Sequence, residues 1–236
     1  MDIFRFKQFE VDQTGCAMKV NTDGVLLGAM AEVNDPKSIL DIGTGTGVIA
    51  LMLAQRYPSA TIDAVEVDGD AARMSAENFK NSQFSNRLSA HHCSFENYFE
   101  VHEGLKFDLI VSNPPFFLSS LTSANNKKNL ARHTDSAFFE RLLKDLAKHL
   151  TERGTSQLIL PLPTSELIRG LLPKFKLHLH KIIAIKSFTD SEPHREIITF
   201  GKEEKQLQIQ ELFIYDEPKV YAKDYQLLLK DFLTIF

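Results

Sequence analysis

The chain has 236 residues, enough to build one α/β domain with a complete hydrophobic core. No apolar run approaches the roughly 20 residues that cross a bilayer, which argues against a membrane protein. The net charge is −4, so nucleic-acid binding would require a local basic patch.

Cysteine usage and the first residues favour a cytoplasmic protein. Cys16 and Cys93 lie far apart and indicate neither a zinc site nor a disulfide framework. Residues 1–9 mix charged and aromatic side chains, unlike the apolar core of a secretory signal. We expect one domain over residues 1–236, cytoplasmic and monomeric, with no metal.

A predicted strand, a glycine loop and a predicted helix follow one another early in the chain. The strand covers residues 38–40, and the helix covers 48–56 and ends before Pro58. The loop holds one acid and three alternating glycines, Asp41, Gly43, Gly45 and Gly47. Glycines let the backbone approach a ligand, and the helix start offers unpaired N–H groups. The third glycine comes one residue too early for G-x-G-x-x-G, which disfavours a hydride-transferring Rossmann enzyme, and a P-loop lysine is missing.

An acid follows the next predicted strand, which covers residues 61–65. This acid is Glu66, and an acid about 20 residues beyond such a loop binds a ribose diol in related folds. The alternative is an exposed carboxylate at the start of the following helix, a role that suits Asp68 and Asp70 better.

A stiff turn follows the strand predicted at residues 107–112. It consists of Asn113, Pro114, Pro115 and Phe116. The prolines have a fixed φ and no N–H, so the turn is rich in acceptors. The Asn113 side-chain oxygen and the Pro114 carbonyl can accept both hydrogens of an exocyclic amine or amide, while Phe116 stacks on the attached planar group. The alternative is a simple proline turn with Phe116 in the core.

The remaining elements predict a doubly wound α/β fold. Further strands are predicted at 88–93, 156–160, about 175–185 and 196–200, and helices at about 137–150, closed by Gly154, and at 164–172. Alternating strands and helices indicate a mostly parallel, seven-stranded sheet with helices on both faces. The last two strands, joined without a helix, predict an antiparallel hairpin at one edge.

Two further segments carry weaker signals. Residues 119–129 are rich in Ser and Asn and form either a flap over the substrate or a plain loop. Tyr225, Leu228, Leu229 and Phe232 have helical spacing, which predicts a C-terminal helix packed on the sheet.

The glycine loop, the ribose acid and the Asn-Pro-Pro-Phe turn, in this order, resemble class I S-adenosylmethionine-dependent methyltransferases. Residues 16–28 resemble the N-terminal signature of the bacterial tRNA1(Val) adenine-N6 methyltransferases, and 131–133, 193–195 and 221–232 are similar to the same family. The resemblance runs from about residue 4 to 232. It implies S-adenosylmethionine as cofactor, tRNA as partner, and methylation of N6 of adenine 37 beside the anticodon of a valine tRNA.

The resemblance also implies residue roles. Thr22 and Asp23 would lie near the methionine end of the cofactor, with segment 1–37 packed over the site. The cofactor would be lined by Asp41, Gly43, Gly45, Gly47, Glu66, Val67, Ser94 and Phe95, and the base would be held by Asn113, Pro114, Pro115 and Phe116. Many related enzymes place an Asp where this chain has Ser94, whose hydroxyl is a weaker acceptor for the adenine amine.

Two groups of basic residues are candidates for tRNA contacts. The first is Lys127, Lys128 and Arg132, near the proposed pocket, and the second is Lys174, Lys176 and Lys181, in a stretch without acids. In this stretch Lys174, Lys176, His178 and His180 alternate with apolar residues at strand period, which predicts a basic stripe on one face of a strand. Arg195 is a further candidate. Solvated surface charge is the alternative for both groups.

Other classes of protein share some of these motifs. Glutamine-N5 methyltransferases of release factors and ribosomal-RNA guanine-N2 methyltransferases use a similar turn, and a non-catalytic nucleotide-binding module would keep the fold. The methyl sulfonium is already activated, so we expect no nucleophile and no general base.

Overall fold

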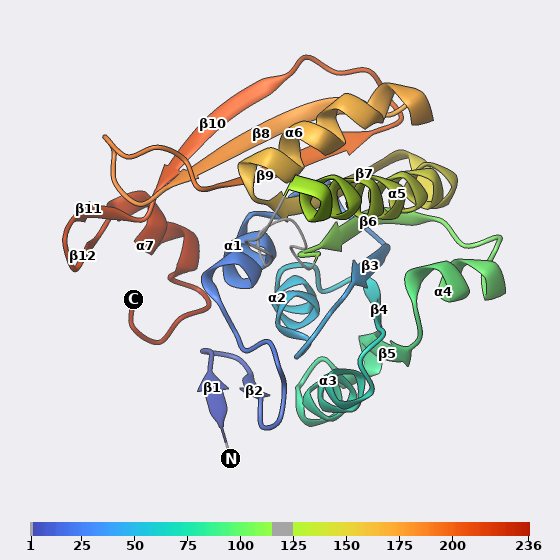
Figure 1. The fold of residues 1–236 in the computed structure, drawn as a ribbon. Helices are drawn as coiled ribbons and strands as arrows, with labels where there is room; N and C mark the ends of the chain where they lie inside the picture. The colour runs from blue at the N-terminus through green and yellow to red at the C-terminus, as the bar shows by residue number, and fades with distance from the viewer. Residues whose placement is uncertain (1, 115–124) are drawn as a thin grey trace.

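The structure is a computed structural model that describes residues 2–114 and 125–236, with the backbone alone described for 125–135. Within these residues, an eight-stranded sheet has the order β10-β8-β9-β7-β6-β3-β4-β5 (Figure 1). Its strands are β3 Ser38–Ile42, β4 Thr61–Glu66, β5 Leu88–His92, β6 Phe107–Ser112, β7 Leu150–Leu160, β8 His178–Lys186, β9 Arg195–Gly201 and β10 Gln208–Phe213. The pairs that β9 makes with β7 and β8 are antiparallel and the others are parallel. The predicted mostly parallel α/β fold is confirmed.

Helices cover both faces of the sheet. One face carries α1 Thr22–Met30, α2 Val48–Arg56, α3 Gly69–Asn81 and α7 Lys223–Leu229, and the other carries α4 Phe95–Val101, α5 Asn125–His149 and α6 Leu162–Leu171. Short 3-10 helices cover Ser85–Arg87 and Leu172–Phe175, and two small hairpins are formed by β1 Ile3–Arg5 with β2 Glu10–Asp12 and by β11 Tyr215–Glu217 with β12 Val220–Tyr221. Each face therefore buries its own apolar cluster.

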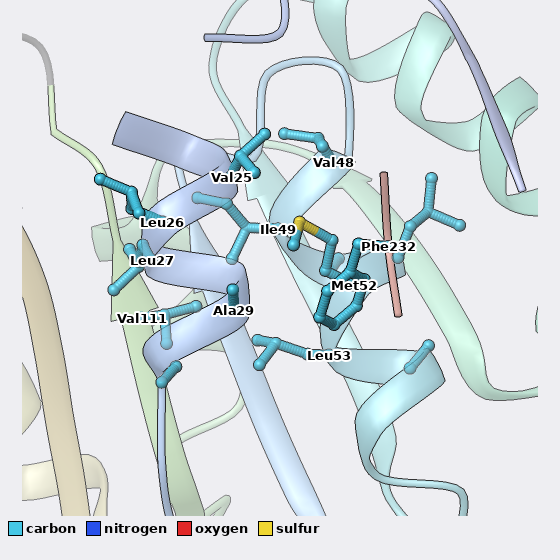
Figure 2. Close-up of a cluster of buried hydrophobic side chains, with 14 of the residues drawn as sticks. Val25, Leu26, Leu27, Ala29, Val48, Ile49, Met52, Leu53, Val111 and Phe232 are labelled. Carbon is cyan, nitrogen blue, oxygen red and sulfur yellow. The ribbon is translucent and has the colours of Figure 1, made fainter. Parts of the chain in front are cut away.

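The parallel helices α1 and α2 pack closely because small residues line their contact. A Cβ added to Gly28 would lie 2.9 Å from Met52 Cβ, so a larger residue there would push the helices apart. Figure 2 shows Val25 and Ile49 packed between these helices, with Phe232 on the far side of Met52. Met52 is fully buried, and burial of such a side chain contributes about 1.5–3 kcal/mol. This packing brings the starts of both helices to one end of the sheet.

The sheet has one strand more than the sequence predicted. The hairpin of β8 and β9 exists, but β10 pairs with β8 and takes the edge position. The first four residues of β10 are exposed, and two of the four are glutamines. A strand so little buried lacks the apolar pattern by which strands are recognised in a sequence.

Two predicted boundaries between residues 119 and 160 are wrong. Residues 125–129 belong to α5, which begins well before residue 137, while 119–124 fall outside the described residues. Gly154 does not end this helix but lies inside β7. A Cβ at Gly154 would lie 2.6 Å from the Phe107 carbonyl oxygen, beside an irregularity in the β6–β7 register. The glycine is therefore required by close strand packing, which local sequence does not reveal.

The predicted packing of the C-terminal segment is confirmed. Tyr225, Leu229 and Phe232 are buried in the cluster beneath α1 and α2. In the described part of the chain, no helix combines the length and apolar character needed to cross a membrane.

Candidate active site

The predicted site residues gather at the carboxyl ends of three neighbouring strands. Ile42, the last residue of β3, pairs with Val65 of β4 on one side and with Ser112 of β6 on the other. The glycine loop, Glu66 and Asn113 therefore begin from the same row of the sheet. This is the edge at which open α/β sheets bind ligands.

The first two glycines of the loop border open space, whereas the third is tightly packed against a side chain. Gly43, Gly45 and Gly47 have φ values of 72°, 56° and 86°, in the region that favours glycine. An added Cβ would meet no atom within 4 Å at Gly43 or Gly45, but at Gly47 it would lie 2.5 Å from the Phe79 ring. Gly43 and Gly45 therefore leave space for a ligand, while Gly47 allows α2 to start against α3.

Backbone amides hold the Glu66 carboxylate in place. Its Oε2 accepts from Gly45 N at 2.9 Å, and its Oε1 accepts from Val67 N at 2.8 Å and Asp68 N at 3.0 Å. The carboxylate thus joins the end of β4 to the glycine loop, where a ribose diol is expected. Asp68 caps α3 through Ala71 N, so it has the structural role proposed as the alternative for Glu66.

Asp41 lies beneath the loop and not on its open surface. It is fully buried, and its Oδ2 accepts from Thr44 Oγ1 at 2.7 Å. Burial raises the pKa of Asp41 to about 7 and the charge of Glu66 adds to the rise, while hydrogen bonds from Thr44 and the Ala50 backbone oppose it. Its Oδ1 finds no hydrogen-bond partner among the described residues. The fully buried carboxyl group therefore supports the loop from beneath.

The acceptor turn is described in part. Ser112 Oγ donates to the Ile42 carbonyl at 2.8 Å and ties the end of β6 to β3. Asn113 is half-buried and Pro114 is buried, one row from the glycine loop. Pro115 and Phe116 lie outside the described residues, so the expected stacking by Phe116 stays a prediction.

The N-terminus of α1 joins this edge. Asn21 caps the helix by accepting from Gly24 N at 2.9 Å, which places Thr22 and Asp23 in its first turn. Asp23 Oδ2 accepts from Arg195 Nε at 2.8 Å. The sequence suggests Arg195 as a tRNA contact, whereas the structure pairs it with a residue expected at the cofactor. A partner 172 residues away has no signal in local sequence.

Ser94 and Phe95 have structural roles at the end of β5. Ser94 caps α4, and its Oγ accepts from Asn97 N at 3.2 Å. Phe95 is buried, and its ring centroid lies 5.7 Å from that of Phe138. Val67 remains 71% exposed beside Glu66, which leaves its side chain accessible to a ligand.

The predicted basic stripe is wrong in its geometry. Lys174 lies in a 3-10 helix and Lys176 has a φ of 54°, because the chain turns before β8 begins at His178. Lys174 pairs with Glu140 at 2.8 Å and Lys181 with Glu32 at 3.2 Å. These carboxylates come from distant segments and neutralise a stretch that has no acid of its own. Lys127, Lys128 and Arg132 lie on α5, where the backbone alone is described.

Two supporting residues escaped the sequence analysis. Asn21 precedes a helix and occupies the cap position that favours Asn, so its signal was available. Thr44 supplies the hydroxyl that holds Asp41, and its place within the glycine loop gave no separate signal. Among the described residues, no group of three His, Cys, Asp or Glu side chains could hold a metal ion.

Comparison with known proteins agrees with this geometry. Residues 19–165 match the methyltransferase small domain family. A predicted O-methyltransferase from Agrobacterium tumefaciens aligns with a TM-score of 0.70 at 18% identity, covering 89% of this chain and 96% of that one. A methyltransferase from Pyrococcus furiosus aligns with a TM-score of 0.56 at 20% identity, covering 80% and 89%. Fold and glycine loop together define a class I methyltransferase.

Two curated relatives show which family within this class the chain resembles. The tRNA1(Val) (adenine(37)-N6)-methyltransferase of Pedobacter heparinus is 46% identical, with 99% of this chain and 98% of the relative covered. The enzyme of the same name from Flavobacterium psychrophilum is 41% identical, with 98% of each covered. The chain belongs to the tRNA1(Val) (adenine(37)-N6)-methyltransferase family.

Proposed function

We propose that the protein transfers a methyl group from S-adenosylmethionine to N6 of an adenine in tRNA, adenine 37 of a valine tRNA. The names of the relatives supply the substrate. The observation that carries the proposal is the row shared by the glycine loop, Glu66 and Asn113 at the ends of β3, β4 and β6. In this row the loop expected to bind the nucleoside lies next to the turn expected to accept the amine, which supports the proposal.

The described residues fit the cofactor. The cofactor would lie over the open space at Gly43 and Gly45, and Glu66 would accept hydrogen bonds from its ribose hydroxyls. The buried Asp41 would support the glycine loop from below. When bound, S-adenosylmethionine supplies an activated methyl group. The protein is then left with the tasks of holding, orienting and excluding water.

Asn113 and Pro114 would hold the acceptor amine. The N6 lone pair of adenine is delocalised into the ring, and acceptance of both N–H bonds would favour a pyramidal nitrogen with a lone pair aimed at the methyl. The same acceptors stabilise the positive charge that develops on N6. The proton can leave to water after transfer, so no residue is assigned as a general base. An adenine within the stacked anticodon loop must first swing out of the stack.

For contacts to the tRNA backbone we favour Lys127, Lys128 and Arg132 over Lys174, Lys176 and Lys181. The first group lies in the first part of α5, the helix that comes after the acceptor turn in the chain. Two of the second group are neutralised by Glu140 and Glu32. Phosphate contacts of this kind would position the tRNA, and the pocket would select the base.

The experiment is methylation of a valine tRNA transcript followed by mass spectrometry of its nucleosides. We expect N6-methyladenosine, and none in a transcript with adenine 37 replaced by guanine. Methylation of a release-factor glutamine or of a ribosomal-RNA guanine, without methylation of the tRNA, would overturn the proposal.

A further inference from the structure

Asp23 and Arg195 form an ion pair that connects two distant segments at the carboxyl edge of the sheet. Asp23 lies in the first turn of α1, and Arg195 is the first residue of β9. Their atoms Oδ2 and Nε lie 2.8 Å apart, with side-chain exposures of 19% for Asp23 and 29% for Arg195. The two charges are therefore partly withdrawn from water but still accessible to a ligand.

The two partners of the pair lie at different parts of this edge: Asp23 lies in the first turn of α1, and Arg195 begins β9, on the β6 side of the glycine loop. A Cβ on Gly24, next to Asp23, would lie 3.4 Å from Val48 Cγ1, and α2 begins at Val48 directly after the glycine loop. Glu196 pairs with Leu160 at the carboxyl end of β7, so Arg195 lies beyond that end, at the same edge of the sheet as the end of β6. Two strand spacings, roughly 10 Å, separate β9 from β6.

The charge pattern of the pair favours one kind of ligand. A polyanion such as a tRNA backbone gains little from an arginine whose charge is balanced by an adjacent carboxylate. A ligand that carries both an ammonium and a carboxylate matches a fixed pair of opposite charges. The guanidinium has five N–H donors and can serve more than one acceptor at once, as it does here with Asp23 at Nε and the His194 carbonyl at Nη1.

We propose that Asp23 and Arg195 together bind the amino-acid end of the cofactor, with Asp23 receiving the ammonium and Arg195 the carboxylate. This rests on the proposed use of S-adenosylmethionine and extends it to a strand far along the chain from the glycine loop. It moves Arg195 from the expected tRNA contacts to the cofactor site.

The test compares S-adenosylhomocysteine with its decarboxylated form, which lacks only the carboxylate, by isothermal titration. We expect the parent to bind S-adenosylhomocysteine at least tenfold more tightly than the decarboxylated form. Arg195→Gln should reduce this preference to below threefold by weakening the binding of S-adenosylhomocysteine. Asp23→Asn should weaken both ligands, because both carry the ammonium.

Lys186→Gln is the matched control. It breaks another 2.8 Å ion pair, with Glu211, between β8 and β10, and should leave both affinities unchanged. If Arg195→Gln folds poorly, Arg195→Lys keeps the charge and should retain part of the preference. The inference would be overturned if Arg195→Gln kept the parental preference for S-adenosylhomocysteine over its decarboxylated form. It would also be overturned if the parent bound the two ligands equally well. Loss of tRNA affinity alone would assign Arg195 to phosphate. A parent that binds neither ligand would instead contradict the proposed function.

Discussion

The end of β4 and the segment 174–181, which leads into β8, both carry charged residues that the sequence singled out, but these residues are held in different ways. The Glu66 carboxylate accepts from three backbone N–H groups, one in the glycine loop and two in the residues that follow Glu66. Lys174 and Lys181 are held by Glu140, which comes from α5, and by Glu32, which lies two residues after α1.

This difference shows which functional features can be predicted from local sequence and which cannot. A site made by consecutive backbone atoms follows from glycine spacing and strand order, so local sequence predicts it. A charged surface depends on which distant side chains approach it. Substitutions at the carboxyl ends of the strands should therefore impair binding or catalysis, whereas substitutions in the basic segment should have little effect.

The largest effect is expected at the acceptor turn. Asn113→Ala should lower the rate of methyl transfer at least about a hundredfold, because the lost acceptor acts mainly in the transition state. Affinity for S-adenosylhomocysteine should stay within twofold, measured by isothermal titration. A rate within threefold of the parent would show that Asn113 does not hold the amine.

Glu66→Ala should weaken S-adenosylhomocysteine binding tenfold to a hundredfold. Hydrogen bonds to a charged group contribute about 1.5–3 kcal/mol, and the ribose would lose them. Asp68→Asn is the control, since it alters the cap of α3 but not the proposed ribose site. Equal losses in both variants would place the ribose elsewhere.

Asp41 should make stability depend on pH. In the folded protein Asp41 keeps its proton up to a pKa of about 7, whereas in the unfolded chain its pKa has the ordinary value of 3.8. Between these pH values the folded state binds more protons, so the free energy of unfolding falls as pH rises. From pH 5 to pH 8, the parent should lose about 1–3 kcal/mol relative to Asp41→Asn, which cannot titrate. Urea denaturation at both pH values measures this, and parallel curves would contradict the assignment.

The smallest effect is expected in the basic segment. Replacing Lys174, Lys176 and Lys181 with Gln should leave tRNA affinity within about threefold and the log–log salt slope within half a unit, because two of these charges are already balanced. The matched triple variant of Lys127, Lys128 and Arg132 should lower the slope by about two units. Filter binding across a salt series measures both, and the reverse result would restore the basic stripe as the tRNA contact.

The sequence by itself determined the parallel sheet, the glycine loop and the position of Glu66 and Asn113 at strand ends. Each depends on residues adjacent in the chain: glycines that accept positive φ, apolar runs that form buried strands, and prolines that stiffen a turn. Because carboxyl ends of parallel strands share one edge, the strand order alone brought these residues together.

The tertiary structure alone decided which charges are paired and which polar groups are buried. Asp41 has the same local pattern as a ligand-lining acid, yet it is covered by the loop that follows it. From the sequence Arg195 is a candidate tRNA contact, but in the structure it pairs with Asp23 of α1. Lys176 was assigned to a strand, but the turn before β8 gives it a left-handed backbone. Such outcomes depend on contacts between segments far apart in the chain, which no local spacing encodes.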